Sequence, residues 1–275
     1  MINLENAVKF PFEDKDWLKT VGVYFLISLG LAIITFVLQT TFQLPADIFN
    51  TIAKETETES FKYLATSTNA ISAFFNMIVS LVTFPVTLYL SGYLFDVVGH
   101  IMYGKKPEIT PHGNIWQRVK FGIVKVVIGF VLGMTSLLLL GFPILTGAAA
   151  AISMESMIVV SILLWIATGV LFLLWLFTCV IIVKFAMYSM EYLYLSEGFK
   201  NVFVLSKVSA LISNNWKKYL LLLGLEILGA IAISLSFVTC CMAFFVYPAV
   251  ATVVAFALAY CYGTVYKEIY TSSRV

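Results

Sequence analysis

The most constraining feature of this chain is a series of six apolar runs, each long enough to cross a lipid bilayer as a single helix. A spanning helix needs about 20 mostly apolar residues, and within lipid it must satisfy its backbone hydrogen bonds internally. With 61% hydrophobic and only 12% charged residues, a soluble chain of this length could not bury its apolar surface. The sequence predicts an all-α integral membrane protein, with spans at residues 17–39, 71–99, 119–142, 157–183, 217–239 and 243–266.

The basic residues are distributed unevenly among the segments that join these runs. Of the 17 lysines and arginines, only Lys54 and Lys62 lie in the connections after the first, third and fifth runs. Because cytoplasmic segments carry the excess of basic residues, both termini are predicted to be cytoplasmic. The net charge of +2 and the absence of a basic cluster give no reason to expect nucleic acid binding.

Three similar stretches begin the first, third and fifth runs. Each contains a tryptophan, and Trp17, Trp116 and Trp216 are 99 and 100 residues apart. A tryptophan beside cations is typical of the headgroup level, so these stretches are predicted to anchor the chain at the cytoplasmic interface. The predicted anchoring cations are Lys19, Arg118, Lys217 and Lys218. The spacing indicates one membrane domain built from three repeated hairpins, residues 1–106, 107–200 and 201–275.

The segments outside the runs receive simpler predictions. The residues before Pro11 and residues 198–213 are predicted to form helices that lie at the interface. Residues 40–70 contain the polar stretch AKETETES and are predicted to be a solvated extracytoplasmic loop. Residues 141–153, the stretch GFPILTGAAAAIS, are predicted to be a plain turn or a re-entrant connection.

The second, fourth and sixth runs end in tyrosine-rich segments. Tyrosines four residues apart share one helix face, as in Tyr89 and Tyr93, Tyr188 and Tyr192, and Tyr262 and Tyr266. These faces are interpreted either as a belt of interfacial aromatic residues or as a tyrosine-lined cytoplasmic vestibule.

The membrane-entry segments resemble those of a known family. FPFEDKDWLK at 10–19, SGYLFDVVGHIMYGKKPEI at 91–109 and EGFKNVFVLSKVSALISNNWKKYLLLLG at 197–224 resemble the prokaryotic domain-of-unknown-function family 4013. The last segment is also similar to the membrane domain attached to some glycerophosphodiester phosphodiesterases. The resemblance implies a multi-pass protein of a prokaryotic cell membrane and brings no activity with it.

Ionisable residues inside the predicted spans are candidates for function, because each costs about 2.5–3.5 kcal/mol at a helix centre. Glu226 lies eight residues after Lys218, about 12 Å along a helix. Lys125 and Glu226 lie at similar distances from their tryptophans, so they are predicted to pair, with Lys184 as a second candidate partner for Glu226. Such a group is either a structural ion pair or part of a proton or substrate relay.

Metal and nucleophile chemistry have weak support in the sequence. Asp96 and His100 lie one helical turn apart and could bind a metal only with Glu108 or His112, so no metal or cofactor is predicted. The adjacent pair Cys240–Cys241 is interpreted as packing residues, with a redox or acylation site as the alternative. No catalytic motif of the GxSxG, HExxH or P-loop kind occurs, so no catalytic residue is predicted.

Small residues on the third run predict close helix packing. Gly122, Gly129 and Gly133 fall on nearly the same face, against an internal helix or another subunit. Together the features favour a non-enzymatic accessory or scaffold subunit that associates with the bilayer and with other membrane proteins. The alternatives are a transporter or channel-like protein for a small or lipidic solute that uses Glu226, and an intramembrane enzyme.

Overall fold

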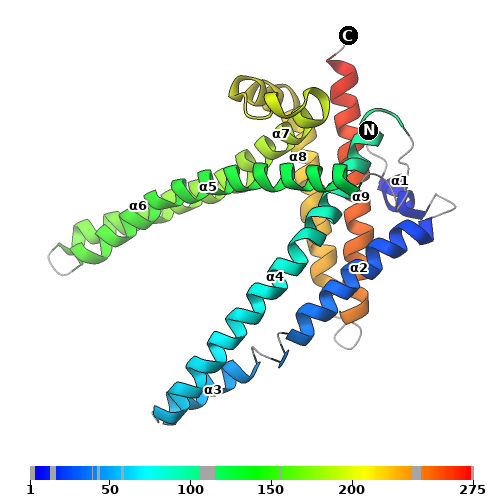
Figure 1. Cartoon of the computed structure of the whole chain (residues 1–275). Helices are drawn as coiled ribbons and strands as arrows, with labels where there is room; N and C mark the ends of the chain where they lie inside the picture. Colours follow the sequence, from blue (N-terminus) through cyan, green and yellow to red (C-terminus); the bar gives the residue numbers. More distant parts are fainter. Residues whose placement is uncertain are drawn as a thin grey trace. The chain divides into compact units, whose positions relative to one another are not determined.

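The computed structural model describes residues 4–12, 17–38, 40–41, 44–56, 59–105, 115–154, 157–236 and 243–273, and their regular secondary structure is helical. The elements are α1 (Leu4–Lys9), η1 (Phe10–Phe12), α2 (Trp17–Leu38), α3 (Leu44–Thr56), α4 (Glu59–Met102), α5 (Ile115–Ser153), α6 (Ile158–Phe177), η3 (Thr178–Val183), α7 (Lys184–Glu197), η4 (Phe199–Asn201), α8 (Leu205–Ser236) and α9 (Ala243–Ser272). Figure 1 labels the α-helices along the chain.

In the described part of the chain, five stretches of helix are long and apolar enough to cross a membrane, as expected for an all-α multi-pass membrane protein. They are Lys62–Met102, Ile115–Ser153, Ile158–Glu197, Leu205–Ser236 and Val246–Ser272. The first predicted span corresponds to α2, where the described apolar helix, Val21–Val37, is shorter than the others.

The predicted loop at residues 40–70 is wrong, because most of this segment is helical. Helix α3 ends at Thr56 and α4 starts at Glu59, and α4 continues for 44 residues. The polar stretch is rich in alanine, lysine and glutamate, which are good helix formers. Asn50 and Asn69 exchange two side-chain hydrogen bonds of 3.2 and 3.3 Å and so tie α3 to the start of α4.

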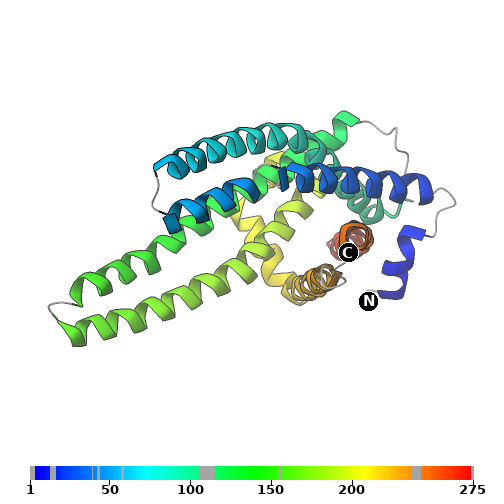
Figure 2. The ribbon, with the colours of Figure 1, turned by 90° about the horizontal axis from the view of Figure 1, so that it is seen from below.

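The turn or re-entrant connection predicted at residues 141–153 is also helix. Helix α5 continues to Ser153 through a run of alanines, the strongest helix formers, and α6 begins at Ile158. The two helices lie side by side in Figures 1 and 2. Three hydrogen bonds join them: Ser161 Oγ to Ala150 O at 2.8 Å, Thr168 Oγ1 to Thr146 Oγ1 at 3.1 Å and Trp175 Nε1 to Ser136 O at 2.8 Å.

Helix α8 joins a predicted interfacial segment to a predicted span through a break at Asn215. The backbone there has φ −125° and ψ 15°, outside the helical region. The Asn215 side chain donates a 3.2 Å hydrogen bond to the carbonyl of Leu211, the residue one turn earlier. The break therefore lies between the predicted interfacial segment, residues 198–213, and the predicted span that begins at residue 217.

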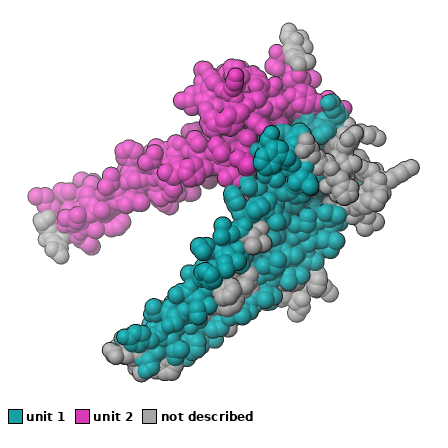
Figure 3. All heavy atoms as spheres, in the orientation of Figure 1, with its two compact units in different colours: residues 1–101, 105–122, 229–261 teal, residues 102–104, 123–228, 262–275 magenta. Residues whose placement is uncertain are grey.

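The chain forms two compact units, coloured separately in Figure 3. Unit 1 comprises residues 1–101, 105–122 and 229–261. Unit 2 comprises residues 102–104, 123–228 and 262–275.

In unit 1, two glycines let the backbones of α4 and α5 touch. A Cβ on Gly92 would lie 1.7 Å from the carbonyl oxygen of Arg118, and one on Gly122 would lie 2.0 Å from that of Leu88. Gly122 thus packs against an internal helix. Gly129 and Gly133 do not pack against a described internal helix, because a Cβ on either would meet no described atom within 4 Å, and packing against another subunit stays a prediction for these two.

The close crossing of α4 and α5 predicts that adding one methyl group at either glycine will lower the stability of the protein. Gly92→Ala and Gly122→Ala should each lower the free energy of unfolding by about 1–3 kcal/mol or more, the range typical of overpacking. The loss arises because the added methyl group pushes the two backbones apart. Gly129→Ala is the control and should be neutral or up to about 1 kcal/mol more stable, because alanine is the better helix former. Thermal unfolding in detergent measures the difference, and equal stability of all three variants would contradict the crossing.

Candidate functional site

The candidate site lies in unit 2 and begins with one face of helix α7. Lys184, Tyr188 and Glu191 follow one another at four and three residues, so they share a face. The preceding six residues, Thr178–Val183, form a π-helical segment. A π-turn inserts an extra residue into the helix, and such turns are frequent at functional sites because they change which face the following residues occupy.

The first ion pair joins α7 to α8. Lys184 Nζ lies 2.8 Å from Glu226 Oε2, a charge-assisted hydrogen bond. The other carboxylate oxygen of Glu226 accepts a hydrogen bond from the hydroxyl of Tyr262 on α9. Both oxygens of Glu226 therefore have a partner from a neighbouring helix.

The second ion pair joins α7 to α5. Lys125 Nζ lies 3.5 Å from Glu191 Oε1, and the Glu191 side chain is only 2% exposed. The Tyr266 hydroxyl of α9 lies 3.4 Å from the other oxygen of this carboxylate, a long hydrogen bond. We call these four ionised residues, together with Tyr188, Tyr262 and Tyr266, the acid–base cluster.

Aromatic rings fill the space around the acid–base cluster. The ring of Tyr188 lies 5.7 Å from that of Tyr262 and 5.8 Å from that of Tyr219, centre to centre. Tyr188, Tyr219 and Tyr266 are completely buried. Ser189 is buried too and donates a 3.2 Å hydrogen bond to the Tyr219 hydroxyl. The tyrosine rings and the Glu191 carboxylate are therefore enclosed by protein side chains, whereas the side chains of Lys125, Lys184 and Glu226 are 30%, 38% and 19% exposed.

The charges of the acid–base cluster balance, with two carboxylates against two ammonium groups. The Glu191 side chain is only 2% exposed, so removing its lysine would leave a carboxylate in a medium that solvates ions poorly. Hydrogen bonds from tyrosine hydroxyls disperse the carboxylate charge further. The arrangement can hold four helices in one register, and it can also pass a proton between a hydroxyl and a carboxylate.

The predicted pair of Lys125 with Glu226 is wrong, because the structure pairs Lys125 with Glu191. The partner of Glu226 is the second candidate, Lys184. The prediction compared depths along two helices, and depth does not say which faces meet. Glu191 was missed, although its spacing from Lys184 and Tyr188 was a usable signal.

The interpretation of the tyrosines as an interfacial belt is wrong for five of them. Tyr93, Tyr188, Tyr192, Tyr262 and Tyr266 are buried within their units. A belt residue turns its ring toward lipid, whereas these rings contact one another and polar groups of neighbouring helices.

The predicted interfacial anchors fall into three groups. Trp116 and Trp216 are 65% and 49% exposed, and Lys120 and Lys217 lie 5.7 Å from the centres of their respective rings. Lys218 is partly exposed and lies 3.9 Å from Glu268. The side chains of Trp17 and Lys19 lie outside the described part of the structure. These positions suit an anchoring role, which stays a prediction.

Arg118 differs from the predicted anchor. It is 2% exposed, because the close crossing of α4 and α5 turns its side chain inward in unit 1. Its Nη1 donates a 2.9 Å hydrogen bond to the Tyr89 hydroxyl, and its guanidinium carbon lies 4.5 Å from the centre of the Tyr93 ring.

The described residues contain no group of three or more histidine, cysteine, aspartate or glutamate side chains able to hold a metal ion. His100 Nδ1 lies 3.5 Å from Asp96 Oδ1, and Arg118 Nε lies 3.7 Å from the other oxygen of that carboxylate. The two further ligands considered from the sequence, Glu108 and His112, lie outside the described residues, as do Cys240 and Cys241.

The buried ion pair predicts a strongly non-additive mutational cycle. Lys125→Met should destabilise the protein by about 3–5 kcal/mol, because it leaves the buried Glu191 carboxylate without its cation. Adding Glu191→Gln should recover much of that loss, since the double variant buries no charge. Lys217→Met, which removes an exposed cation, should change stability by no more than about 0.5 kcal/mol. Unfolding in detergent of these three variants and of Glu191→Gln alone, which completes the cycle, gives all four values, and additive losses from the two single changes would refute the pair.

Comparison with protein-family models, with curated proteins and with solved structures found no match to this chain.

Proposed function

We propose that this chain is a non-enzymatic accessory or scaffold subunit that associates with other proteins in the cell membrane of a prokaryote. In this proposal the chain crosses the bilayer six times as three repeated hairpins, with both termini in the cytoplasm. Support for the topology comes from the position of the basic residues, of which only Lys54 and Lys62 lie on the outer side. The prokaryotic membrane rests on the resemblance of the membrane-entry segments.

The observation that carries the proposal is that the carboxylates of the acid–base cluster pair with lysines and tyrosines of neighbouring helices. A transporter built around Glu226 needs a polar passage that substrate and water can enter. Glu226 instead binds Lys184 and Tyr262, and completely buried tyrosine rings surround the neighbouring carboxylate. Because the charged groups of the acid–base cluster pair with one another among packed rings, a structural role of the cluster is favoured.

The α5–α6 hairpin supplies the association surface in this proposal. Unit 2 itself leaves large apolar side chains exposed along both helices, including Leu138 and Leu173. The contacts between α5 and α6 are made by small and polar groups, such as Thr146 with Thr168. A lipid-exposed helix pair with regular packing on one side only can accept another helix on the other side.

A transporter or channel-like protein is the second candidate, and a specific observation favours it. The π-helical segment Thr178–Val183 leads directly into Lys184, whose ammonium group is partly exposed and pairs with Glu226. Interrupted helices beside an ionisable pair are common at transport sites. Entry of water to the acid–base cluster would favour this second function.

The association proposal predicts site-specific crosslinking in native membranes. A photoreactive amino acid at Leu138 should give one discrete adduct, and the same probe at Leu173 should give an adduct of the same mass. Mass spectrometry should identify the added protein as another membrane protein. The same probe at Ile128, a completely buried position on α5, should give none. Lipid adducts alone from both exposed positions would contradict the proposal, and adducts between two copies would show self-association instead.

A further inference from the structure

The α5–α6 hairpin of unit 2 is uncharged from the acid–base cluster to its tip. The sequence has no lysine, arginine, histidine, aspartate or glutamate between Lys125 and Glu155, and none between Glu155 and Lys184. Residues 126–153 continue as helix on α5, and residues 158–183 continue as helix through α6 and the π-helical segment. At about 1.5 Å per residue, each of these two stretches is about 40 Å long.

This length exceeds the part of a bilayer that excludes water. The hydrocarbon core is about 30 Å thick, and a helix whose apolar stretch is longer than the core is accommodated by tilting. An upright hairpin would place about 10 Å of both helices, roughly seven residues of each, beyond the core. The side chains there are large and apolar, and Ile152, Ile158 and Val159 are 79%, 69% and 72% exposed. Upright insertion would therefore leave these side chains in contact with water.

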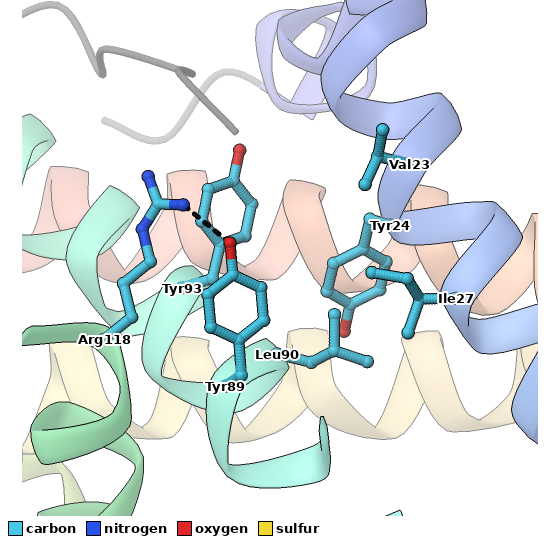
Figure 4. Close-up of a pocket in the computed structure, with 7 residues that line it drawn as sticks. All are labelled: Val23, Tyr24, Ile27, Tyr89, Leu90, Tyr93 and Arg118. Carbon is cyan, nitrogen blue, oxygen red and sulfur yellow. Dashed lines mark hydrogen bonds between the residues drawn. The ribbon is translucent and has the colours of Figure 1, made fainter. Parts of the chain in front are cut away.

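The start of α5 carries side chains of the kinds that hold a helix end at an interface, whereas the far end of the hairpin lacks them. Near the start, Trp116 is exposed, and Arg118 donates a hydrogen bond to the Tyr89 hydroxyl, as Figure 4 shows. Residues 142–164 contain no tryptophan, tyrosine, lysine or arginine. A single charge, Glu155, separates the two helices in the sequence and suits the far headgroup level. The apolar ends of both helices thus have no cation or aromatic anchor that would hold them outside the hydrocarbon.

Exposed apolar side chains follow α6 along its whole length. They lie at intervals of four and seven residues, so they share one helix face, and each is more than half exposed. The series consists of Ile158, Ile162, Ile166, Leu173 and Phe177. A face that is apolar and uncharged from end to end is complementary to lipid acyl chains and is poorly solvated by water.

We propose that the α5–α6 hairpin lies within the hydrocarbon along its whole uncharged length, with the acyl chains of phospholipids as its partner there. This step rests on the membrane-spanning topology given under the proposed function. About 40 Å of helix fits a core of about 30 Å when the hairpin is tilted by about 40° from the bilayer normal, the upper end of the usual range. A thinner bilayer then increases the tilt of the hairpin and does not expose its tip.

Collision measurements on single spin labels test whether the tip lies in lipid. In a full chain with all four native cysteines replaced, Ile152→Cys and Ile158→Cys place a label at the tip on either helix. In dioleoyl phosphatidylcholine vesicles both labels should collide readily with oxygen, which dissolves in hydrocarbon. Their collision rate with a water-soluble nickel chelate should be roughly tenfold lower than that of the exposed control Ser209→Cys, because hydrocarbon excludes polar solutes. The buried control Ile128→Cys should collide little with either reagent.

Three results would overturn the proposal. Nickel collision at either tip position close to that of Ser209→Cys would place the tip in water. Little collision with both reagents, as at Ile128→Cys, would show that a second copy of the chain covers the tip. A severalfold rise in nickel collision in thinner dimyristoleoyl phosphatidylcholine vesicles would indicate an upright hairpin.

A second readout keeps the native cysteines, in case their replacement prevents folding. A photoreactive amino acid at Ile158 should form adducts with phosphatidylcholine in the same vesicles, and adducts between two copies of the chain without lipid adducts would contradict the proposal. The vesicles contain no other protein, so these results do not depend on a partner. The accessory function can therefore fail in its own crosslinking test while the lipid contact stands, and the reverse also holds.

Discussion

The pairing of lysine with glutamate between apolar helices is the interaction on which the structure of unit 2 depends. Lys184 with Glu226, and Lys125 with Glu191, place four charges where neither lipid nor a hydrocarbon core would solvate them. Neither pair could form within one helix, so each fixes the rotation of one helix relative to another. Tyrosine hydroxyls from α9 complete the coordination of both carboxylates, which adds a further helix to the same register.

This interaction also limits the functions open to the protein. Charges that are matched in number and enclosed by rings hold helices in place at little cost, provided that every partner is present. In unit 1 the same residue types are used differently, because Arg118 has tyrosines around it but a looser contact with its carboxylate. The matched charges of unit 2 support the proposal of an accessory subunit, because they are bonded to one another.

The sequence predicted the helices far better than it predicted their partners. Apolar runs and the break at Asn215 follow from local chemistry, and the structure has helices where these features require them. Residues 40–70 were misjudged because a polar stretch can be helical when its residues are good helix formers. Similar depth along their helices suggested that Lys125 and Glu226 meet. Which faces of two helices contact one another depends on tertiary packing, however, and packing cannot be read from a single sequence. Arg118 illustrates the same limit, since two glycines on different helices turn it inward.

The most direct test asks whether water reaches the acid–base cluster. In a variant with all four native cysteines replaced, Ser189→Cys places a thiol of nearly the same size beside Tyr188 and Tyr219. A charged, membrane-impermeant thiosulfonate reagent should fail to label this cysteine in the native protein, label it after denaturation, and label the exposed control Ser209→Cys in both states. Labelling of native Ser189→Cys at a rate close to that of the control would show an open aqueous passage, and it would contradict a closed structural core.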